Sequence, residues 1–252
     1  MNAGAAEDNS GQINWLYQVG VGDGIMTDTQ ENVNIYKLPF SYMFEDFNEK
    51  NWNLKLNFPL SIGVYSIEAE EQNIDLDFIA IIPGIELHIP LRENWVLIPL
   101  ADFGFGKSTS GESIQYLYSV GIKHHVLFEW RLFDFTFGNT LRNEGYFAGG
   151  NGGADNTSLF TTGLDMKFPL GIKLFKKPGY LSFYGMNYYY FEEIEIDVDT
   201  KTIQIETQWE LGLTLSTIPS LKIWWFSIER VGLGYRFGDG FSAIRLVFGM
   251  PF

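Results

Sequence analysis

The feature that most constrains the fold of this chain is an alternation of apolar and polar side chains that recurs from end to end. A period of two places successive side chains on opposite faces of a β-strand. The clearest case is 202–216, where one face carries Ile203, Ile205, Trp209, Leu211, Leu213 and Leu215. The same pattern runs through 14–22, 51–66 and 113–128, and no stretch has the spacing of an amphipathic helix. The chain is therefore predicted to be all-β.

Turn and loop signals divide the alternating sequence into about twelve runs. Compact connections alternate with acidic or Gly-rich ones, of which 140–156 is the longest, and Pro83–Gly84 predicts a bulge in the fourth run. No shift of composition marks a domain boundary. We expect a flexible N-terminal segment over 1–11 and one domain over 12–252. The predicted strands lie near 12–22, 33–44, 51–66, 74–90, 95–106, 113–128, 130–139, 157–170, 180–191, 202–216, 224–237 and 241–252.

Composition excludes several classes of protein. The chain has 252 residues, a formal net charge of −14 and no cysteine, which excludes a disulfide scaffold and thiolate chemistry and argues against a nucleic-acid partner. No apolar run is long enough for a membrane-spanning helix. Residues 1–11 have neither a basic nor an apolar region, so no signal peptide is expected. The 22 Phe, 13 Tyr and 7 Trp are more aromatic surface than a soluble core of this size needs.

The length of the runs favours a membrane over a soluble core. Several runs alternate over 12–16 residues, whereas strands in a soluble sandwich usually have about 5–6 residues and about 9–11 tilted residues cross a bilayer. The polar face is rich in Gly, Ser, Asn, Gln and charged residues, as expected of a polar lumen. A soluble β-sandwich or lipocalin-like binder is the outside alternative. Aromatic side chains gather at the run ends, where they suit a girdle at the lipid headgroups, with the tryptophans Trp15, Trp52, Trp95, Trp130, Trp224 and Trp225.

The C-terminal residues carry the most specific signal. Apolar side chains stand at every second position, Ile244, Leu246, Phe248, Met250 and Phe252, and the last is aromatic. This tail resembles the C-terminal signature of Gram-negative outer-membrane β-barrels. The resemblance implies a closed antiparallel up-and-down barrel of about twelve strands in the bacterial outer membrane. It also implies contact with the bilayer and lipopolysaccharide, and an assembly signal at Phe248, Met250 and Phe252 for the barrel assembly machinery.

Among such proteins the chain is weakly similar to solitary autotransporter-type twelve-stranded barrel domains. About eleven residues precede the first predicted strand, so secretion of a passenger is not expected. We predict a small channel or a structural membrane protein, with an autotransporter-like translocator as one alternative. A lipid-modifying outer-membrane enzyme is the other alternative.

The alternation also assigns charged side chains to the lumen. Glu210 and Arg230 lie equally far from a turn expected near Ser220, so they are predicted to be cross-strand neighbours in a band of opposed charges. Such a band either narrows a selective pore or fills the lumen of a structural protein, and its mixed signs predict no ion preference. The predicted lumen-lining charges are Lys55, Asp102, Lys123, Asp134, Asp165, Lys167, Glu206, Glu210, Arg230, Arg236 and Arg245.

No catalytic residue, cofactor or metal site is predicted. His124 and His125 point to opposite faces of a strand and cannot share a metal ion, and no His–Ser arrangement supports acyl transfer. The acidic loops either bridge to lipopolysaccharide phosphates through divalent cations or simply solvate the surface. These loop carboxylates are Glu68, Glu70, Glu71, Glu192, Glu193, Glu195, Asp197 and Asp199.

Overall fold

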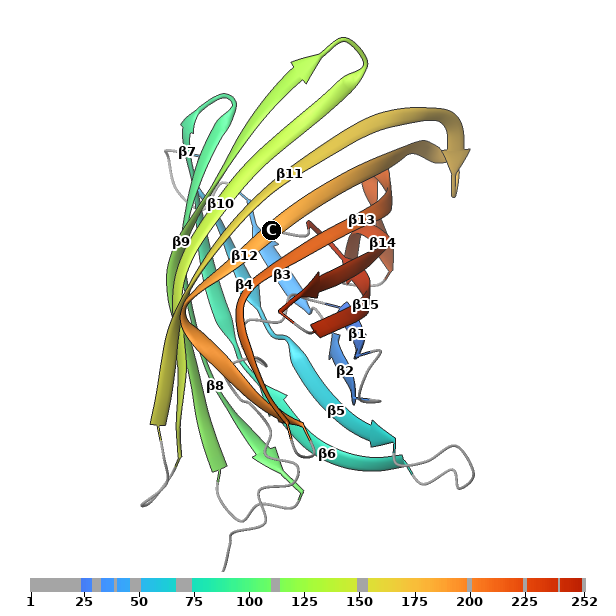
Figure 1. Ribbon diagram of the computed structural model, residues 1–252. Coiled ribbons are helices and arrows are strands. Elements are labelled where there is room, and N and C mark those ends of the chain that lie inside the picture. Colours follow the sequence, from blue (N-terminus) through green and yellow to red (C-terminus); the bar gives the residue numbers. More distant parts are fainter. Residues whose placement is uncertain are drawn as a thin grey trace, which may run out of the picture.

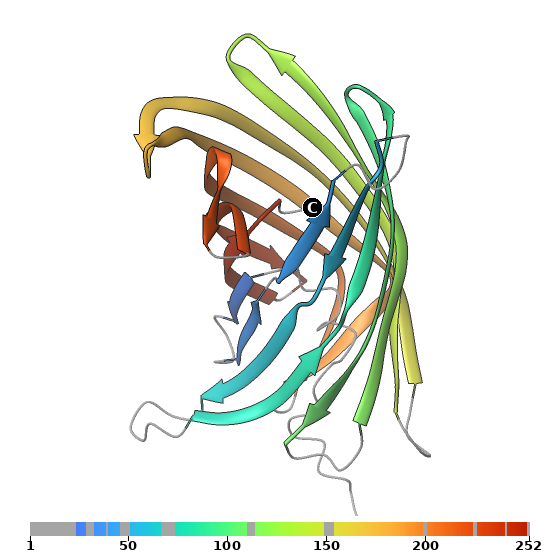
Figure 2. The same cartoon turned by 180° about the vertical axis from the view of Figure 1, so that it is seen from behind.

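A computed structural model shows an all-β, antiparallel, up-and-down sheet that curls through 290° into a half-barrel (Figures 1 and 2). The structure describes residues 24–28, 33–38, 40–45, 51–66, 74–109, 114–148, 154–198, 201–223, 226–239 and 241–250. The expected all-β antiparallel class is confirmed at the level of this strongly curled sheet.

The sheet contains fifteen strand segments. Most connect consecutive neighbours as hairpins, and β1 at one end of the chain pairs antiparallel with β15 at the other. The segments are β1 (Gly24–Asp28), β2 (Val33–Leu38), β3 (Ser41–Phe44), β4 (Asn53–Asn57), β5 (Leu60–Ser66), β6 (Ile74–Ile81), β7 (Gly84–Arg92), β8 (Trp95–Ser108), β9 (Ile114–Trp130), β10 (Phe133–Ala148), β11 (Ala154–Leu174), β12 (Lys177–Val198), β13 (Lys201–Ile223), β14 (Phe226–Gly238) and β15 (Phe241–Phe248).

Three predicted runs are each divided in two, and the sequence has a proline in every gap: Pro39, Pro59 and Pro83. Proline cannot donate to the ladder, so it interrupts strand pairing. The gaps are neighbours in the sheet, because Phe58 N donates to Phe40 O and Ile82 N donates to Pro59 O. The strand is therefore interrupted at Pro83–Gly84, as expected, and this break is one part of a crease that crosses adjacent strands. The bulge predicted there is wrong, because β6 and β7 keep the same register against β8 on the two sides of the break.

Two boundary predictions are wrong, one near the N-terminus and one in the middle of the chain. The predicted loop 23–32 contains β1, which forms because its backbone pairs with both β2 and β15. The predicted Gly-rich loop 140–156 is mostly strand, since β10 continues to Ala148 and pairs with β11 as far as Ala154. Cross-strand pairing overrides the local turn signal there. The first predicted strand, 12–22, and the expected flexible segment 1–11 lie outside the described residues.

The acidic connection predicted near 192–201 is also largely strand. β12 reaches Val198 and β13 begins at Lys201, so each has more than twenty residues. At about 3.3 Å per residue such strands exceed the ~30 Å hydrocarbon thickness of a bilayer.

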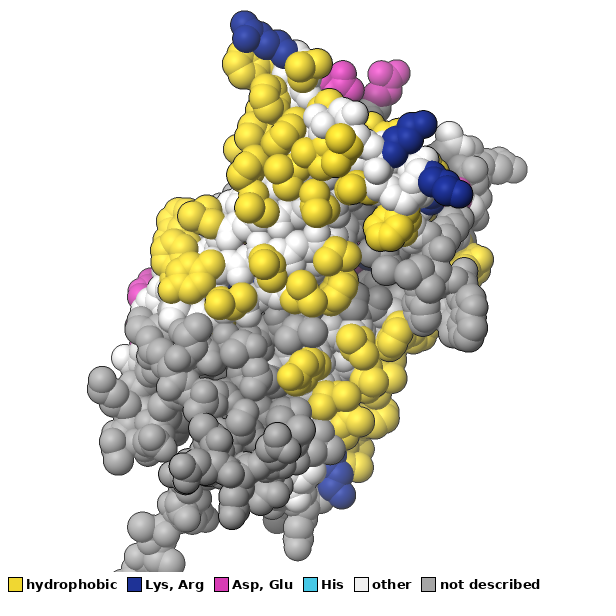
Figure 3. Space-filling model, turned by 90° about the vertical axis from the view of Figure 1, so that its right-hand side faces the viewer, with side chains coloured by type: hydrophobic (Ala, Val, Ile, Leu, Met, Phe, Trp, Pro, Cys, Tyr) yellow, Lys and Arg dark blue, Asp and Glu magenta, His cyan; other side chains and the backbone are white. Residues whose placement is uncertain are grey.

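The two faces of the sheet differ in chemistry. Along β13 the outward side chains of Trp209, Leu211 and Leu213 are 51%, 57% and 44% exposed, whereas the intervening Gln208 and Glu210 are fully buried on the inner, concave face. Broad areas of exposed hydrophobic side chains are visible on one side of the molecule (Figure 3). Part of the inner face is apolar, with Phe78, Leu117, Leu159, Tyr190, Ile194 and Ile205 in one buried cluster.

Replacing Gly104 by Ala tests the crease. A Cβ at Gly104 would lie 2.0 Å from Ile81 O and 2.5 Å from Ile82 Cα; both are backbone atoms that cannot move aside. We expect Gly104→Ala to lower the free energy of unfolding by about 1–3 kcal/mol, measured by urea unfolding of refolded protein through tryptophan fluorescence. Gly185→Ala is the control, because its Cβ would meet only Leu211 Cδ2 at 3.2 Å. Equal stability of the two variants would contradict the proposed close packing.

Candidate functional site

The inner face of β13, β14 and β15 brings together a fully buried carboxylate and two arginines. Glu210 lies directly opposite Arg236 in the β13–β14 ladder, and Arg245 comes from β15. Arg236 Nε is 3.0 Å from Glu210 Oε2, and Arg245 Nη2 is 3.0 Å from Glu210 Oε1. All three side chains are at most 1% exposed. Both oxygens of the carboxylate are therefore held by guanidinium groups away from water.

Two tyrosines of β12 complete this arrangement. The hydroxyl of Tyr184 donates to Glu210 Oε1 at 2.7 Å, and that of Tyr188 donates to Glu210 Oε2 at 3.1 Å. The guanidinium of Arg236 also lies 3.9 Å from the centroid of the Tyr188 ring, a cation–π contact. We call Glu210, Arg236, Arg245, Tyr184 and Tyr188 the Glu210 cluster. Burying these charges is tolerable only because each is paired.

Two glycines make room for one of these tyrosines. Gly212 and Gly234 are opposite each other on β13 and β14. A Cβ at Gly212 would lie 2.5 Å from the ring of Tyr184, and a Cβ at Gly234 would lie 2.3 Å from its hydroxyl oxygen. The ring therefore occupies the space that two side chains would otherwise fill, which lets its hydroxyl reach Glu210.

The predicted pairing of Glu210 with Arg230 is wrong. Arg230 is in register with Ser216, because β13 continues to Ile223 and β14 begins only at Phe226, so the strands do not turn near Ser220. An irregularity between Ser216 and Leu221, where β13 has extra residues, shifts the register partly back, and Arg236 lies opposite Glu210. Arg230 Nη1 instead lies 2.9 Å from Asp165 Oδ1 on β11. Both remain on the inner face, as predicted, but as a separate pair.

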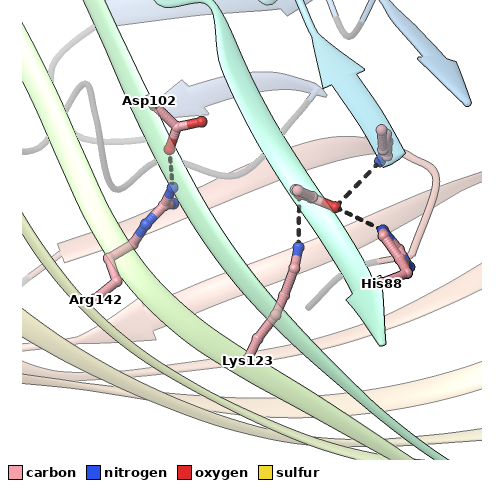
Figure 4. Close-up of polar contacts among 6 residues, drawn as sticks. His88, Asp102, Lys123 and Arg142 are labelled. Carbon is pink, nitrogen blue, oxygen red and sulfur yellow. Dashed lines mark hydrogen bonds and ion pairs between the residues drawn. The ribbon is translucent and has the colours of Figure 1, made fainter. Parts of the chain in front are cut away.

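A second cluster surrounds Glu86 on β7. Lys123 Nζ lies 2.8 Å from Glu86 Oε1, while His88 Nε2 and Lys55 Nζ lie 3.2 Å and 3.9 Å from Oε2. We call these four residues the Glu86 cluster. Figure 4 shows side chains from three strands converging on the carboxylate. Unlike the Glu210 cluster it is partly open, since the side chains of Lys55, His88 and Lys123 are 25%, 23% and 16% exposed.

The remaining predicted lumen charges fall into smaller pairs or outside the inner face. Asp102 accepts a hydrogen bond from Arg142, beside the Glu86 cluster (Figure 4), and Lys167 Nζ lies 3.0 Å from Asp134 Oδ2. Glu206 is exposed, while its neighbour Ile205 is fully buried. The prediction for Glu206 is wrong because the β12–β13 ladder is irregular between Tyr189 and Ile194, and the inward parity of β13 changes near that point.

Several inner-face residues were not predicted from the sequence. Arg142 and Glu144 were missed because they stand in the segment predicted as a Gly-rich loop. Glu86 and His88 follow the break at Pro83, where the parity of the alternation changes. Glu144 is fully buried, and neither of its carboxylate oxygens has a hydrogen-bond partner within the described part of the chain. Extending the alternation of β10 past Thr140 would have found Arg142 and Glu144.

The predicted aromatic girdle and tail are only partly within the described residues. Trp130, at the end of β9, is 59% exposed and has the Arg131 guanidinium 5.0 Å from its ring. Trp95, at the start of β8, packs edge-to-face against His124. Trp52 is half-buried, as are Phe248 and Met250 of the tail. The predicted positions that lie outside the described residues are Trp15, Trp224, Trp225 and Phe252.

The histidines and the described loop carboxylates engage in local hydrogen bonds. Asn139 Nδ2 donates a hydrogen bond to His124 Nε2 at 3.0 Å. Glu192 accepts hydrogen bonds from Thr157 and from the backbone of Ser158, and Glu193 is exposed. Within the described ranges, no group of three or more His, Asp or Glu residues could hold a metal ion. The other loop carboxylates, Glu68, Glu70, Glu71, Glu195, Asp197 and Asp199, have no described side chain.

Comparisons with known proteins identify no relative of this chain. No family model, no curated protein and no solved structure matches the chain. Among the described residues, no helix is long and apolar enough to cross a membrane.

A double-mutant cycle tests the Glu210 cluster. Because Glu210 and Arg236 are in contact and buried, Glu210→Gln and Arg236→Gln should be coupled by about 1–3 kcal/mol in the free energy of unfolding. Arg230 is six residues from Arg236 along β14, which is about 20 Å at 3.3 Å per residue. The effects of Glu210→Gln and Arg230→Gln on the free energy of unfolding should therefore be additive to within about 0.5 kcal/mol. Urea unfolding supplies both cycles. If Glu210 were coupled more strongly to Arg230 than to Arg236, the β13–β14 register of the structure would be wrong and the register expected from the sequence would be correct.

Proposed function

We propose that this chain is an integral β-barrel protein of a bacterial outer membrane. In this proposal the curled sheet closes around a charged and partly closed lumen, and the protein acts as a small channel or as a structural membrane protein. The observation that carries the proposal is the inverted arrangement of the two faces. Large apolar side chains are exposed on the outer face, and the buried ion pairs lie within.

The physical reason is the cost of exposing such a surface to water. Leu211, Leu213 and Leu215 leave about half of their surface accessible along one strand, and the same holds on the neighbouring β14 for Leu233 and Tyr235. Contiguous apolar surface of this kind marks contact with another apolar phase. Lipid acyl chains supply that phase around the whole circumference, as they do for transmembrane barrels.

Closure is supported by strand pairing. In hydrocarbon an open sheet edge would leave backbone groups unpaired, each at a cost of several kcal/mol. β1 pairs with β15 on one side and β2 on the other, and β8 pairs with β9 as well as with β6 and β7. These pairings support a ring of hydrogen-bonded strands without a lipid-exposed edge.

The proposal includes partners that follow from the same setting. The apolar outer face would contact the bilayer, the outer rim would contact lipopolysaccharide, and the C-terminal tail would be read by the barrel assembly machinery. Among the described residues the inner face carries charge pairs, which suit the proposed channel or structural role.

A single substitution separates a membrane barrel from a soluble sheet. Leu215 is 47% exposed in the middle of β13. In a bilayer, Leu215→Arg should destabilise the protein by about 2–4 kcal/mol, whereas the same change at a water-exposed site should cost less than about 0.5 kcal/mol. Urea unfolding in lipid vesicles measures the difference. Phe175→Arg is the control, because Phe175 is 78% exposed in the turn between β11 and β12. Equal, negligible effects would contradict the membrane proposal.

Planar-bilayer recording tests whether the lumen is narrowed by the Glu210 cluster. Glu210→Ala with Arg236→Ala removes a matched pair of opposite charges together with most of its side-chain volume. We expect a larger single-channel conductance than that of the wild type, which should be small or absent. Asp134→Ala with Lys167→Ala is the control, because Asp134 is about half exposed and the pair lies outside the cluster. A wild-type pore whose conductance is unchanged by the first double substitution would exclude the cluster as a constriction.

A further inference from the structure

The Glu86 cluster has more cationic groups than it needs to neutralise its carboxylate. Lys55 and Lys123 each carry a positive charge, and the ring of His88 lies beside them at 3.2 Å from Glu86 Oε2. Only Glu86 opposes them within the cluster. The site is therefore positive, although the whole chain carries a formal net charge of −14.

The positive groups are also the accessible ones. The side chain of Glu86 is 10% exposed, whereas those of Lys55 and His88 are 25% and 23% exposed. His88 of β7 and Lys123 of β9 reach the carboxylate from two different strands (Figure 4), and Lys55 Nζ of β4 lies 3.9 Å from Glu86 Oε2. A solute moving along the inner face would therefore meet cations in front of a buried counter-charge.

The geometry leaves donors available. Lys55 Nζ is 3.9 Å from Glu86 Oε2, beyond the usual hydrogen-bond distance of about 2.7–3.2 Å, so it makes an ion pair without donating a hydrogen bond to this carboxylate. Its ammonium has three N–H donors. Lys123 Nζ uses one donor at 2.8 Å. The carboxylate fixes both ammonium groups in position without occupying all of their donors.

The surroundings strengthen the field of these cations. The inward side chains of Ile98 and Leu100, 1% and 6% exposed, come from the strand that separates β7 from β9. Such apolar neighbours lower the local dielectric and strengthen charge interactions. The nearest additional carboxylate in Figure 4, Asp102, is engaged by Arg142, so it does not cancel the excess positive charge.

We propose that the Glu86 cluster is a binding subsite for a compact oxyanion, a phosphate or carboxylate group of a solute within the lumen. The anion is held by Lys55 and Lys123, with His88 as an additional donor when its ring presents an N–H. Glu86 keeps the two lysines together while the site is empty. This inference rests on the proposed function only in treating the inner face as the lumen.

Inorganic phosphate is the probe. Full-length protein refolded in detergent is titrated with phosphate by isothermal calorimetry near neutral pH, with folding of each variant checked by heat-modifiable migration on a gel. Wild type should bind saturably. Lys55→Met with Lys123→Met should weaken binding at least about tenfold, the loss expected from two charge-assisted hydrogen bonds. Glu86→Gln should bind more tightly than wild type, because it removes the competing carboxylate.

Matched variants keep the test independent of folding. Lys167→Met is the control, since Lys167 is an inner-face lysine of similar exposure, 21%, paired with Asp134; its phosphate affinity should equal that of wild type. If the double variant does not fold, Lys55→Met alone replaces it in the phosphate titration. This single change should leave folding intact, because the Lys55 ammonium makes no hydrogen bond to Glu86. The absence of saturable binding in both wild type and Glu86→Gln would overturn the proposal. So would equal affinity in Lys55→Met and Lys167→Met.

The readout also separates this inference from the proposed function. Phosphate binding in detergent requires no conduction, so binding by a protein that forms no channel would retain the subsite and reject a channel role. Conversely, an open pore without lysine-dependent phosphate binding would retain the channel and reject the subsite.

Discussion

The whole arrangement depends on one constraint: successive side chains of a β-strand leave the sheet on opposite faces. Once the sheet curls, that geometry becomes a separation of inside from outside. Trp209 and Leu211 point outward because Glu210 between them must point inward. The apolar surface and the buried charges are therefore two consequences of the same pattern, and neither can move without reversing the register of a strand.

The buried charges constrain that register. Isolated ions inside a protein are costly, and removing one partner of a buried pair leaves the other uncompensated. Glu210 is held by two arginines and two tyrosines from three different strands. A slip of β14 by one residue would withdraw Arg236 and leave Glu210 Oε2 without its guanidinium partner. We infer that the Glu210 cluster specifies strand alignment as much as it adds stability.

Much of the fold could be predicted from the sequence, because alternation is a local signal. The structure buries Glu210, Arg236, Arg245 and Asp165, four of the residues that the alternation assigned to one face. The pairing of Glu210 with Arg230 failed because it assumed a turn near Ser220, whereas β13 continues to Ile223. The extra residues of β13 near Ser216 also change the register and leave no mark on the alternation. Glu144 was missed for a different reason. Gly-rich sequence predicts a loop, yet pairing with β9 and β11 keeps the backbone extended there. Whether such a segment is a strand or a loop depends on its neighbouring strands, and a local sequence pattern carries no information about them.

The pairing of β1 with β15 has a consequence for the order of assembly. Most strands pair with the next strand along the chain, so their ladders need only short loops to form. The β1–β15 ladder joins residues more than two hundred positions apart and has five residue pairs, whereas β12 and β13 share one of the longest ladders. Closing a long loop carries an entropy cost that a short ladder offsets poorly. That seam should form last and separate first, which makes it the natural point for the growing sheet to stay open until all other strands are in place.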